Sequence, residues 1–227
     1  FAIDQWFINE TYATAAYGHI SDWNTSAVTN MSNAFDGRTT FNEDIGRWDV
    51  SSVLHMYRIF RHAISFNHNI GDWDVSSVVT LSAAFEHASS FDQDLSNWDT
   101  SSVTHLSAVF NNAVSFNHSV NEWDTSAALN MTNTFRNARS FDHGLANWDT
   151  SKVTSMDQMF EGAFLFDQDL SDWNISSVTN MHNIFAATHA LSNTNKGLIH
   201  ESFASNSNWP YDWREFVALD NSNFQTA

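Results

Sequence analysis

Hydrophobic and polar positions along this chain repeat every 25 residues. With tryptophan taken as position 0, apolar residues recur at +5, +8, +12, +15, +18 and +22, and small polar residues recur at +1 and +3. The copies follow one another without insertion or deletion. A fixed period of this length indicates a repeat protein in which one small unit is stacked on its own copies. The tryptophans that define the period are Trp23, Trp48, Trp73, Trp98, Trp123, Trp148 and Trp173.

The apolar positions are expected to form columns through the stack. One phenylalanine column runs from Phe35 to Phe185 at +12, and a second runs from Phe41 to Phe166 at +18. One repeat alone cannot bury these side chains, whereas neighbouring copies can cover one another. Burying roughly 150–250 Å² per aromatic ring at about 25 cal/mol per Å² contributes several kcal/mol before the entropy of ordering is subtracted. The columns therefore predict a continuous core.

Within each repeat the pattern predicts short strands and a short helix. Positions +5 to +8, such as 53–56, have the length and residue types of a strand, and positions 0 to +2 form a second extended piece. From +8 to +15 the apolar residues fall at i, i+4 and i+7, which is typical of one face of a helix. The predicted fold class is a repeat solenoid with short β-strands and one short helix per repeat.

The remaining chain is predicted to cap this solenoid within a single structural domain. Residues 20–192 hold about seven repeats, residues 1–19 form an N-terminal helical cap over Trp23 and Phe35, and residues 193–227 form a C-terminal cap. The N-terminal side chains that suggest one amphipathic helix are Ile3, Trp6, Phe7, Ile8, Tyr12, Ala15 and Ala16. The C-terminal cap would use Phe203, Trp209, Tyr211 and Trp213, among others.

Composition restricts the partners. The chain has 26 acidic and 9 basic residues and a net charge of −17, which argues against nucleic acid because phosphate binding depends on clustered Lys and Arg. No apolar run approaches the roughly 18 residues that a membrane helix needs, so direct membrane insertion is not expected. Cysteine is absent, which excludes disulfides and thiolate metal sites.

Asp at +1 followed by Ser at +3 allows two interpretations. In the first, the carboxylate accepts backbone N–H groups two and three residues on, in an Asx turn that Asn24 and Asn174 also form at the two ends. In the second, calcium bridges the acidic column. The turn is favoured, and no cofactor is assigned. The acidic column comprises Asp49, Asp74, Asp99, Asp124 and Asp149.

The sequence gives little support for catalysis, for a histidine metal site or for an ice-binding face. The serine at +3 occurs in all seven repeats, whereas a nucleophile needs one unique copy with a base beside it, so no enzyme is predicted. Histidines in adjacent repeats, such as His118 and His143, lack a third ligand and are expected to be solvated. Threonines at +2 and +6, such as Thr100 and Thr104, allow a flat ice-binding face as a minor alternative.

Written as Trp-Asp-Val/Thr-Ser-x-Val-x-x-Met-x-x-x-Phe-x-x-Ala-x-x-Phe-Asn/Asp-x-x-Ile/Leu, the repeat resembles the BspA-like, mycoplasma-lipoprotein type of leucine-rich repeat. The resemblance covers about residues 20–192. It implies an extracellular or cell-surface protein of adhesion or recognition with a right-handed curved solenoid. It supplies no catalytic residues.

A ligand is expected on the sheet along the inner curve, where each repeat contributes the same outward positions. The predicted function is a non-enzymatic recognition or adhesion module that binds a protein or a glycan there, and the alternative is a passive structural component or spacer of a cell-surface assembly. The oligomeric state is left open. The candidate binding residues are Asn30, His55, Thr80, His105, Asn130, Ser155 and Asn180 at +7, Tyr57, Asp157 and His182 at +9, and Arg58 at +10.

Overall fold

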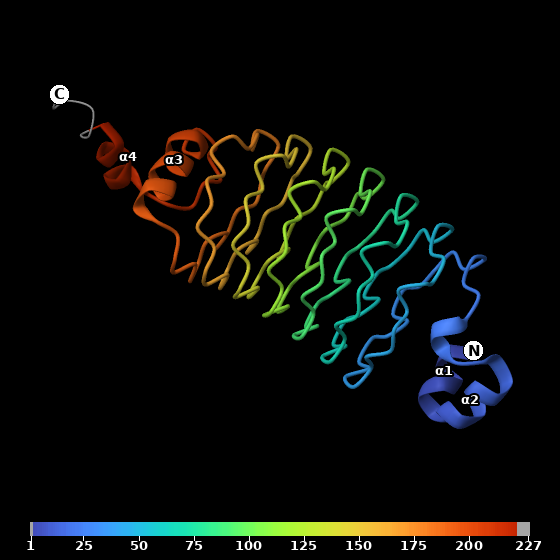
Figure 1. Ribbon diagram of the computed structural model, residues 1–227. Coiled ribbons are helices and arrows are strands. Elements are labelled where there is room, and N and C mark those ends of the chain that lie inside the picture. The colour runs from blue at the N-terminus through green and yellow to red at the C-terminus, as the bar shows by residue number, and fades with distance from the viewer. Residues whose placement is uncertain (1, 222–227) are drawn as a thin grey trace.

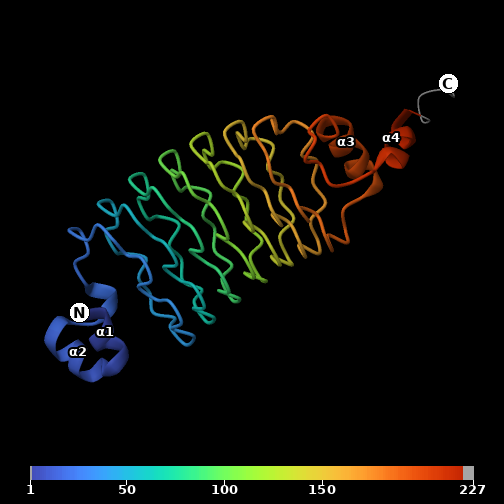
Figure 2. The same ribbon diagram turned by 180° about the vertical axis from the view of Figure 1, so that it is seen from behind.

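Coils of one repeat each lie side by side between helical segments at the two ends of the molecule (Figures 1 and 2). The computed structural model describes residues 2–221, with side chains up to residue 217. The N-terminal end carries α1 (Ala2–Ile8), α2 (Glu10–Tyr17) and a 3₁₀ turn, η1 (Ile20–Asp22). The C-terminal end carries α3 (Asn193–Phe203) and α4 (Arg214–Asn221). Within residues 2–221, all helices lie at these ends.

The predicted strands do not form, so the leucine-rich-repeat-like fold class is wrong. Adjacent coils pair through one isolated parallel bridge each, at +7, and the described chain contains no β-strand and hence no sheet. The backbone turns directly after each bridge, as where the side chain of Asn30 accepts the N–H of Ser32. A turn at this place prevents the extended conformation from continuing, and the short Trp-Asp-Val/Thr segment is ended by a turn in the same way.

The predicted helix from +8 to +15 is also wrong, because this segment is a ribbon of tight turns. The residues at +10 and +14 have φ between 54° and 73° in every coil, which no right-handed helix allows. Apolar residues at +8, +11, +12 and +15 still face inward, so the spacing that suggested a helix is shared by the ribbon. Position +10 is occupied by Ala83, Ala108 and Gln158 in three of the coils, which gives no sequence signal for a left-handed conformation.

Hydrogen bonding explains why the ribbon is stable. In the second coil the N–H groups of Arg58 and Phe60 donate across to the next coil, to the carbonyls of Ser82 and Ala84 at 3.0 and 2.8 Å. The alternate N–H of Ile59 donates within the coil, to the carbonyl of Met56 at 3.2 Å. The first six coils share this division, so their backbone groups near the core are paired in register without a strand or helix.

The predicted apolar columns are confirmed as the core. Rings at +12 stack on their copies with centroids 5.2–5.6 Å apart, and within a coil the rings at +12 and +18 stack at 4.0–4.2 Å. Phe60, Phe85, Phe110, Phe135 and Phe160 are 0% exposed. Offset stacking of this kind adds about 0.5–1.5 kcal/mol per pair beyond burial.

Tryptophan adds a polar link between coils. The indole N–H of Trp98 donates to the carbonyl of Ile70, 28 residues earlier, at 3.0 Å. All six tryptophans from Trp48 to Trp173 make the corresponding bond at 2.8–3.2 Å. Each ring therefore fills the core and fixes the register with the preceding coil.

Polar columns also serve the fold. The Asx turn predicted at +1 is confirmed for the residue two positions on: the carboxylate of Asp49 accepts the backbone N–H and the hydroxyl of Ser51 at 3.1 and 2.6 Å. A ladder at +19 links neighbouring coils, because each Asn or Asp side chain accepts the backbone N–H of its counterpart in the next coil. Its members are Asn42, Asn67, Asp92, Asn117, Asp142, Asp167 and Ser192.

The N-terminal end differs in detail from the single helix predicted. Asn9 ends α1 and caps α2, and of the expected core-facing residues Ile8 is 74% and Tyr12 56% exposed. The predicted cover is nevertheless present, because Trp6 packs edge-on against Trp23 and Phe7 against Phe35.

At the C-terminal end, three aromatic rings close the last coil. Trp209, Tyr211 and Trp213 pack against Phe185, and the hydroxyl of Tyr211 accepts the N–H of Phe185 at 3.0 Å.

We expect Trp98→Phe to lower the free energy of unfolding by about 2 kcal/mol, because it removes a buried hydrogen bond and part of a packed ring. Trp23→Phe is the control: Trp23 is only partly buried and its indole N–H donates to Gly18 within the N-terminal segment. Urea unfolding measures both variants. A loss at Trp23 as large as that at Trp98 would contradict the role given to the inter-coil bond.

The turn ribbon predicts opposite effects of glycine at two exposed alanines. Ala187 has φ 56°, so Ala187→Gly should raise stability by about 1 kcal/mol as the side-chain clash is removed. Ala15 lies within α2, where Ala15→Gly should lower stability by about 1 kcal/mol. Thermal unfolding of the two variants decides the sign, and destabilisation at position 187 would argue for a helical segment there.

Candidate recognition site

The candidate side chains predicted at +7 do come together in one row. Parallel bridges connect them coil by coil along the stack, from Asn30 to Asn180. The row therefore exists as a line of backbone contacts, although the sheet that was expected to carry it does not. The bridged residues are Asn30, His55, Thr80, His105, Asn130, Ser155 and Asn180.

Most side chains of this row are already engaged by their own coil. The side-chain oxygens of Asn30, Asn130 and Asn180 accept the backbone N–H two residues on, at 2.8–3.1 Å. The hydroxyls of Thr80 and Ser155 accept the corresponding N–H at 3.3 and 3.5 Å. The choice among Asn, Ser and Thr at +7 thus follows from the chemistry of a turn.

The two histidines of the row depart from this rule. The ring of His105 contacts the hydroxyl of Thr104 at 2.8 Å, and His55 makes no side-chain hydrogen bond to any described residue. Both side chains are exposed.

The flanking residues form separate pairs. The guanidinium of Arg58 lies 4.6 Å from the ring centre of Tyr57, and its buried Nε has no hydrogen-bond partner among the described atoms. Asp157 and His182 form a contact of 3.4 Å between Oδ1 and Nδ1 in the last two coils. The candidate residues are strung along the molecule and do not converge on one centre.

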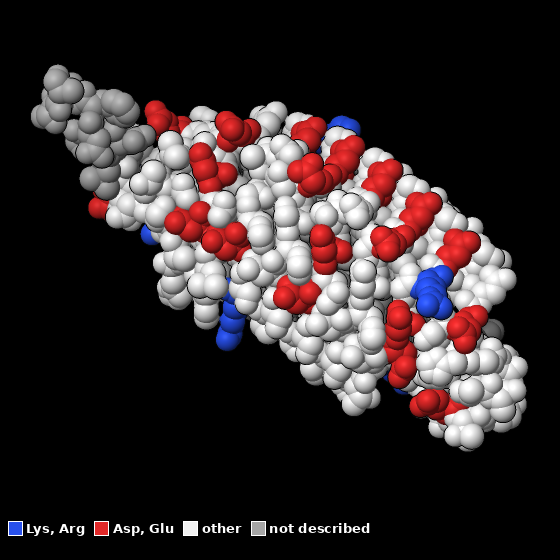
Figure 3. Space-filling view, in the orientation of Figure 1, with Lys and Arg blue, Asp and Glu red and all other residues white. Residues whose placement is uncertain are grey.

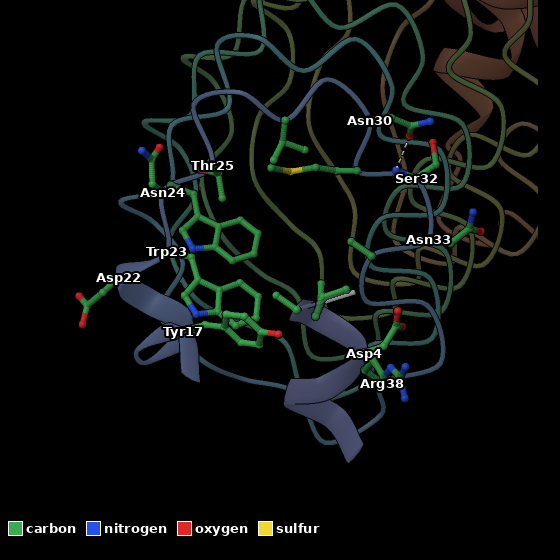
Figure 4. Close-up of a pocket in the computed structure, with 16 residues that line it drawn as sticks. Asp4, Tyr17, Asp22, Trp23, Asn24, Thr25, Asn30, Ser32, Asn33 and Arg38 are labelled. Atoms are coloured by element: carbon green, nitrogen blue, oxygen red, sulfur yellow. Dashed lines mark hydrogen bonds between the residues drawn. The ribbon is translucent and has the colours of Figure 1, made fainter. Parts of the chain in front are cut away.

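A pocket of about 740 Å³ opens between the N-terminal helices and the first coil, and the sequence reasoning missed it. Figure 4 shows Trp23 and Tyr17 on one side, with Asp4, Arg38 and Asn33 on the other. Asn30, the first residue of the predicted row, lies at its upper edge near Ser32 (Figure 4). A volume of roughly 300–1,000 Å³ is usual for ligand sites.

The pocket exists because the first coil has no preceding coil. α1 covers the phenylalanine side of this coil through Phe7, but it leaves Val28 and Ala34 only partly buried. The corresponding residues of the next coil, Val53 and Ile59, are 0% and 1% exposed. The pocket therefore lies at the end of the core where a preceding coil would pack, and its walls are aromatic and polar.

On the face shown in Figure 3, acidic side chains spread along the molecule with few basic ones between them. Hydrogen bonds from the hydroxyl and N–H of the following serine lower the pKa of Asp49, Asp99 and Asp149 below the usual value. The N–H and hydroxyl of Ser96 similarly lower the pKa of Asp94. These bonds favour the ionised carboxylates, which offsets repulsion along the column.

The histidines do not assemble a metal centre in residues 2–217: no three His, Asp or Glu side chains there are placed to hold one ion. His118 lies beside Asp92 at 3.4 Å, and the ring of His143 contacts the carbonyl of Asn117 at 2.9 Å. His62 and His87 stack at 4.6 Å, and burial, followed by the charge of His62, lowers the pKa of His87.

The threonine face considered for ice binding is not present at +2. Thr100, Thr125 and Thr150 are at most 1% exposed, and their hydroxyls donate to the +1 carbonyl of the next coil at 2.9–3.0 Å. The +6 threonines Thr104 and Thr154 remain accessible, but their hydroxyls donate to the preceding coil.

These features define a protein of stacked repeats with a pocket at its N-terminal end and a second pocket, of about 530 Å³, between the last coil and the segment that follows α3. A family model described as "Mycoplasma protein of unknown function, DUF285" matches the chain twice, over residues 3–118 and 79–198, and the chain therefore belongs to the DUF285 family. Comparison with curated proteins and with solved structures finds no match. No helix in the described part of the chain has the length and apolar character to cross a membrane.

We predict that part of the acid sensitivity comes from the Asp–Ser turns. A lowered carboxyl pKa in the folded state stabilises the fold above the unfolded value of 3.8, and this contribution disappears as pH falls through the folded value. Asp49→Asn with Asp99→Asn keeps the turn acceptors, so this variant should lose less of its urea midpoint than wild type between about pH 6 and pH 3.

The control for this prediction is Asp72→Asn with Asp172→Asn, which changes the net charge equally at exposed positions that form no Asx turn. It should retain the pH dependence of the wild type. An equal effect of the two double variants would assign the acid sensitivity to net charge alone.

Proposed function

We propose that this protein is a non-enzymatic recognition or adhesion module that binds a protein or a glycan. The pocket at the N-terminal end carries this proposal. It combines the faces of Trp23 and Tyr17 with polar groups of Asn24, Asn30 and Arg38, in a volume suited to part of a larger ligand. The bridged row extends from Asn30 along the remaining coils and offers a longer contact surface.

The structural use of the repeated polar residues supports a binding role over catalysis. The Asp and Ser side chains that recur in the coils bond to one another in turns, and Asn24 replaces Asp in the first of them. Catalysis requires a unique nucleophile oriented by a base, whereas the hydroxyls of these repeated serines donate hydrogen bonds to the Asp or Asn of their own turn.

A location outside the cell is part of the same proposal. The repeat resembles that of BspA-like bacterial surface proteins, and the family is described from Mycoplasma. The net charge of −17 suits a long molecule with many stacked coils, since like charge opposes self-association.

A passive structural role is the second candidate, and one observation favours it. Five of the seven side chains at +7 are satisfied by their own backbone, which is what a spacer with no ligand along its side would need. In that case ligand screens would find nothing.

The two tyrosines of α2 provide a matched test. Tyr17 is 50% exposed and lines the pocket, whereas Tyr12 is 56% exposed and does not line it. After a glycan and surface-protein array identifies a ligand, Tyr17→Ser should weaken binding about tenfold, the equivalent of about 1.4 kcal/mol. Tyr12→Ser should leave it unchanged.

Isothermal titration of both variants checks this prediction. Equal losses, or losses at neither tyrosine, would remove the pocket from the ligand contact. An array without any hit, repeated with calcium present, would favour the spacer.

A further inference from the structure

The first coil presents an unpaired backbone edge to the pocket. In every later coil the carbonyls at +7, +9 and +11 accept N–H groups of the coil before, as the carbonyls of His55, Tyr57 and Ile59 accept from Met31, Asn33 and Phe35. The corresponding carbonyls of the first coil belong to Asn30, Ser32 and Ala34, and none receives a hydrogen bond from residues 2–221. All three residues line the pocket.

The edge also carries a donor. Between neighbouring coils the N–H at +6 donates to the preceding +6 carbonyl, as Leu54 donates to Thr29 at 2.8 Å. The N–H of Thr29 itself has no acceptor within the described chain. Unpaired backbone groups beside apolar surface favour a partner that satisfies them.

We infer that the pocket binds a peptide segment of another protein, which adds to the stack as an extra coil edge; this rests on the proposed recognition function and names its ligand. The segment donates two N–H groups, two residues apart, to the carbonyls of Asn30 and Ser32, and its own carbonyl accepts the N–H of Thr29. Backbone addition to an open edge is an established mode of peptide recognition.

The interior of the molecule defines which peptide fits. Every junction places a Met or Leu at +8 and a residue with positive φ at +10. The ligand therefore needs an aliphatic side chain followed two residues later by a residue in the left-handed conformation, which Asn and Gly adopt at the lowest cost. The aliphatic side chain would lie over Val28 and Met31, which line the pocket. A ligand side chain at +12 has no room, because Phe7 already packs against Phe35 at this position. The bound peptide segment therefore ends at +11.

The probe is a synthetic peptide with the sequence of residues 178–184, Val-Thr-Asn-Met-His-Asn-Ile, and with both termini blocked. It contains the aliphatic side chain and the Asn that the pocket requires. The Met amide and the second Asn amide are the two expected donors. The first Asn corresponds to +7, whose N–H makes no inter-coil bond in the stack. N-methylation of both donor amides should weaken binding at least tenfold, whereas N-methylation of the first Asn should change it less than twofold.

Isothermal titration measures the three peptides. The amide signal of Thr29 in a nitrogen–proton correlation spectrum should shift with the unmodified peptide and with the control peptide, but not with the donor-methylated peptide. Equal binding of the donor-methylated and control peptides would overturn the proposed backbone pairing. A complete lack of peptide binding would also overturn it.

Two variants localise the binding. Ala34→Arg fills the pocket where the +11 side chain would lie and should abolish peptide binding, whereas Leu165→Arg, at a side chain 56% exposed on the stack, should not. The N-methylated peptides are tested on the wild-type protein, so their result remains valid even if Ala34→Arg impairs folding. Binding of a glycan without any peptide would sink this inference but leave the recognition function standing, whereas failure of both ligand classes would end both.

Discussion

The register between coils rests on one division of backbone hydrogen bonds. In the turn ribbon, alternate N–H groups bond within the coil, as Ile59 does to Met56, and the others bond to the next coil, as Phe60 does to Ala84. A single inserted residue would exchange the two sets and leave polar groups unpaired against the aromatic core, which costs about 1–3 kcal/mol for each group. This constraint explains why the period stays constant through seven copies. It also explains why positions +10 and +14 accept a left-handed conformation whatever residue occupies them.

Polar residues maintain the same register on the outside of the stack. The +1 side chains and the Asn, Ser and Thr side chains at +7 close turns on their own backbone, and the +19 side chains link each coil to the next. A column of Asp or Asn in this chain is therefore part of the fold. The recognition proposed above is therefore placed where the repeat is interrupted, since there the backbone has no neighbouring coil to satisfy it.

The backbone groups at the two ends of the stack are covered in different ways. At the C-terminal end the hydroxyl of Tyr211 accepts a hydrogen bond from the N–H of Phe185. The side-chain amide of Asn206 donates to the carbonyls of Ile175 and Val178. At the N-terminal end, α1 covers the rings of Phe35 and Phe41 but leaves carbonyls of the first coil open beside the pocket. The open carbonyls of the first coil beside the pocket are the feature on which the proposed binding place rests.

The sequence by itself determined the period, the inward columns and the Asx turn at +1, because burial and turn chemistry are local properties of residue type. It did not determine the backbone path. The spacing Met-x-x-x-Phe-x-x-Ala suits a helix and a turn ribbon equally, and Ala108 or Gln158 gives no sign of positive φ. Only hydrogen bonds to the neighbouring coil, a full repeat away in the chain, select the ribbon, and only the end of the stack, where those bonds have no partner, creates the pocket.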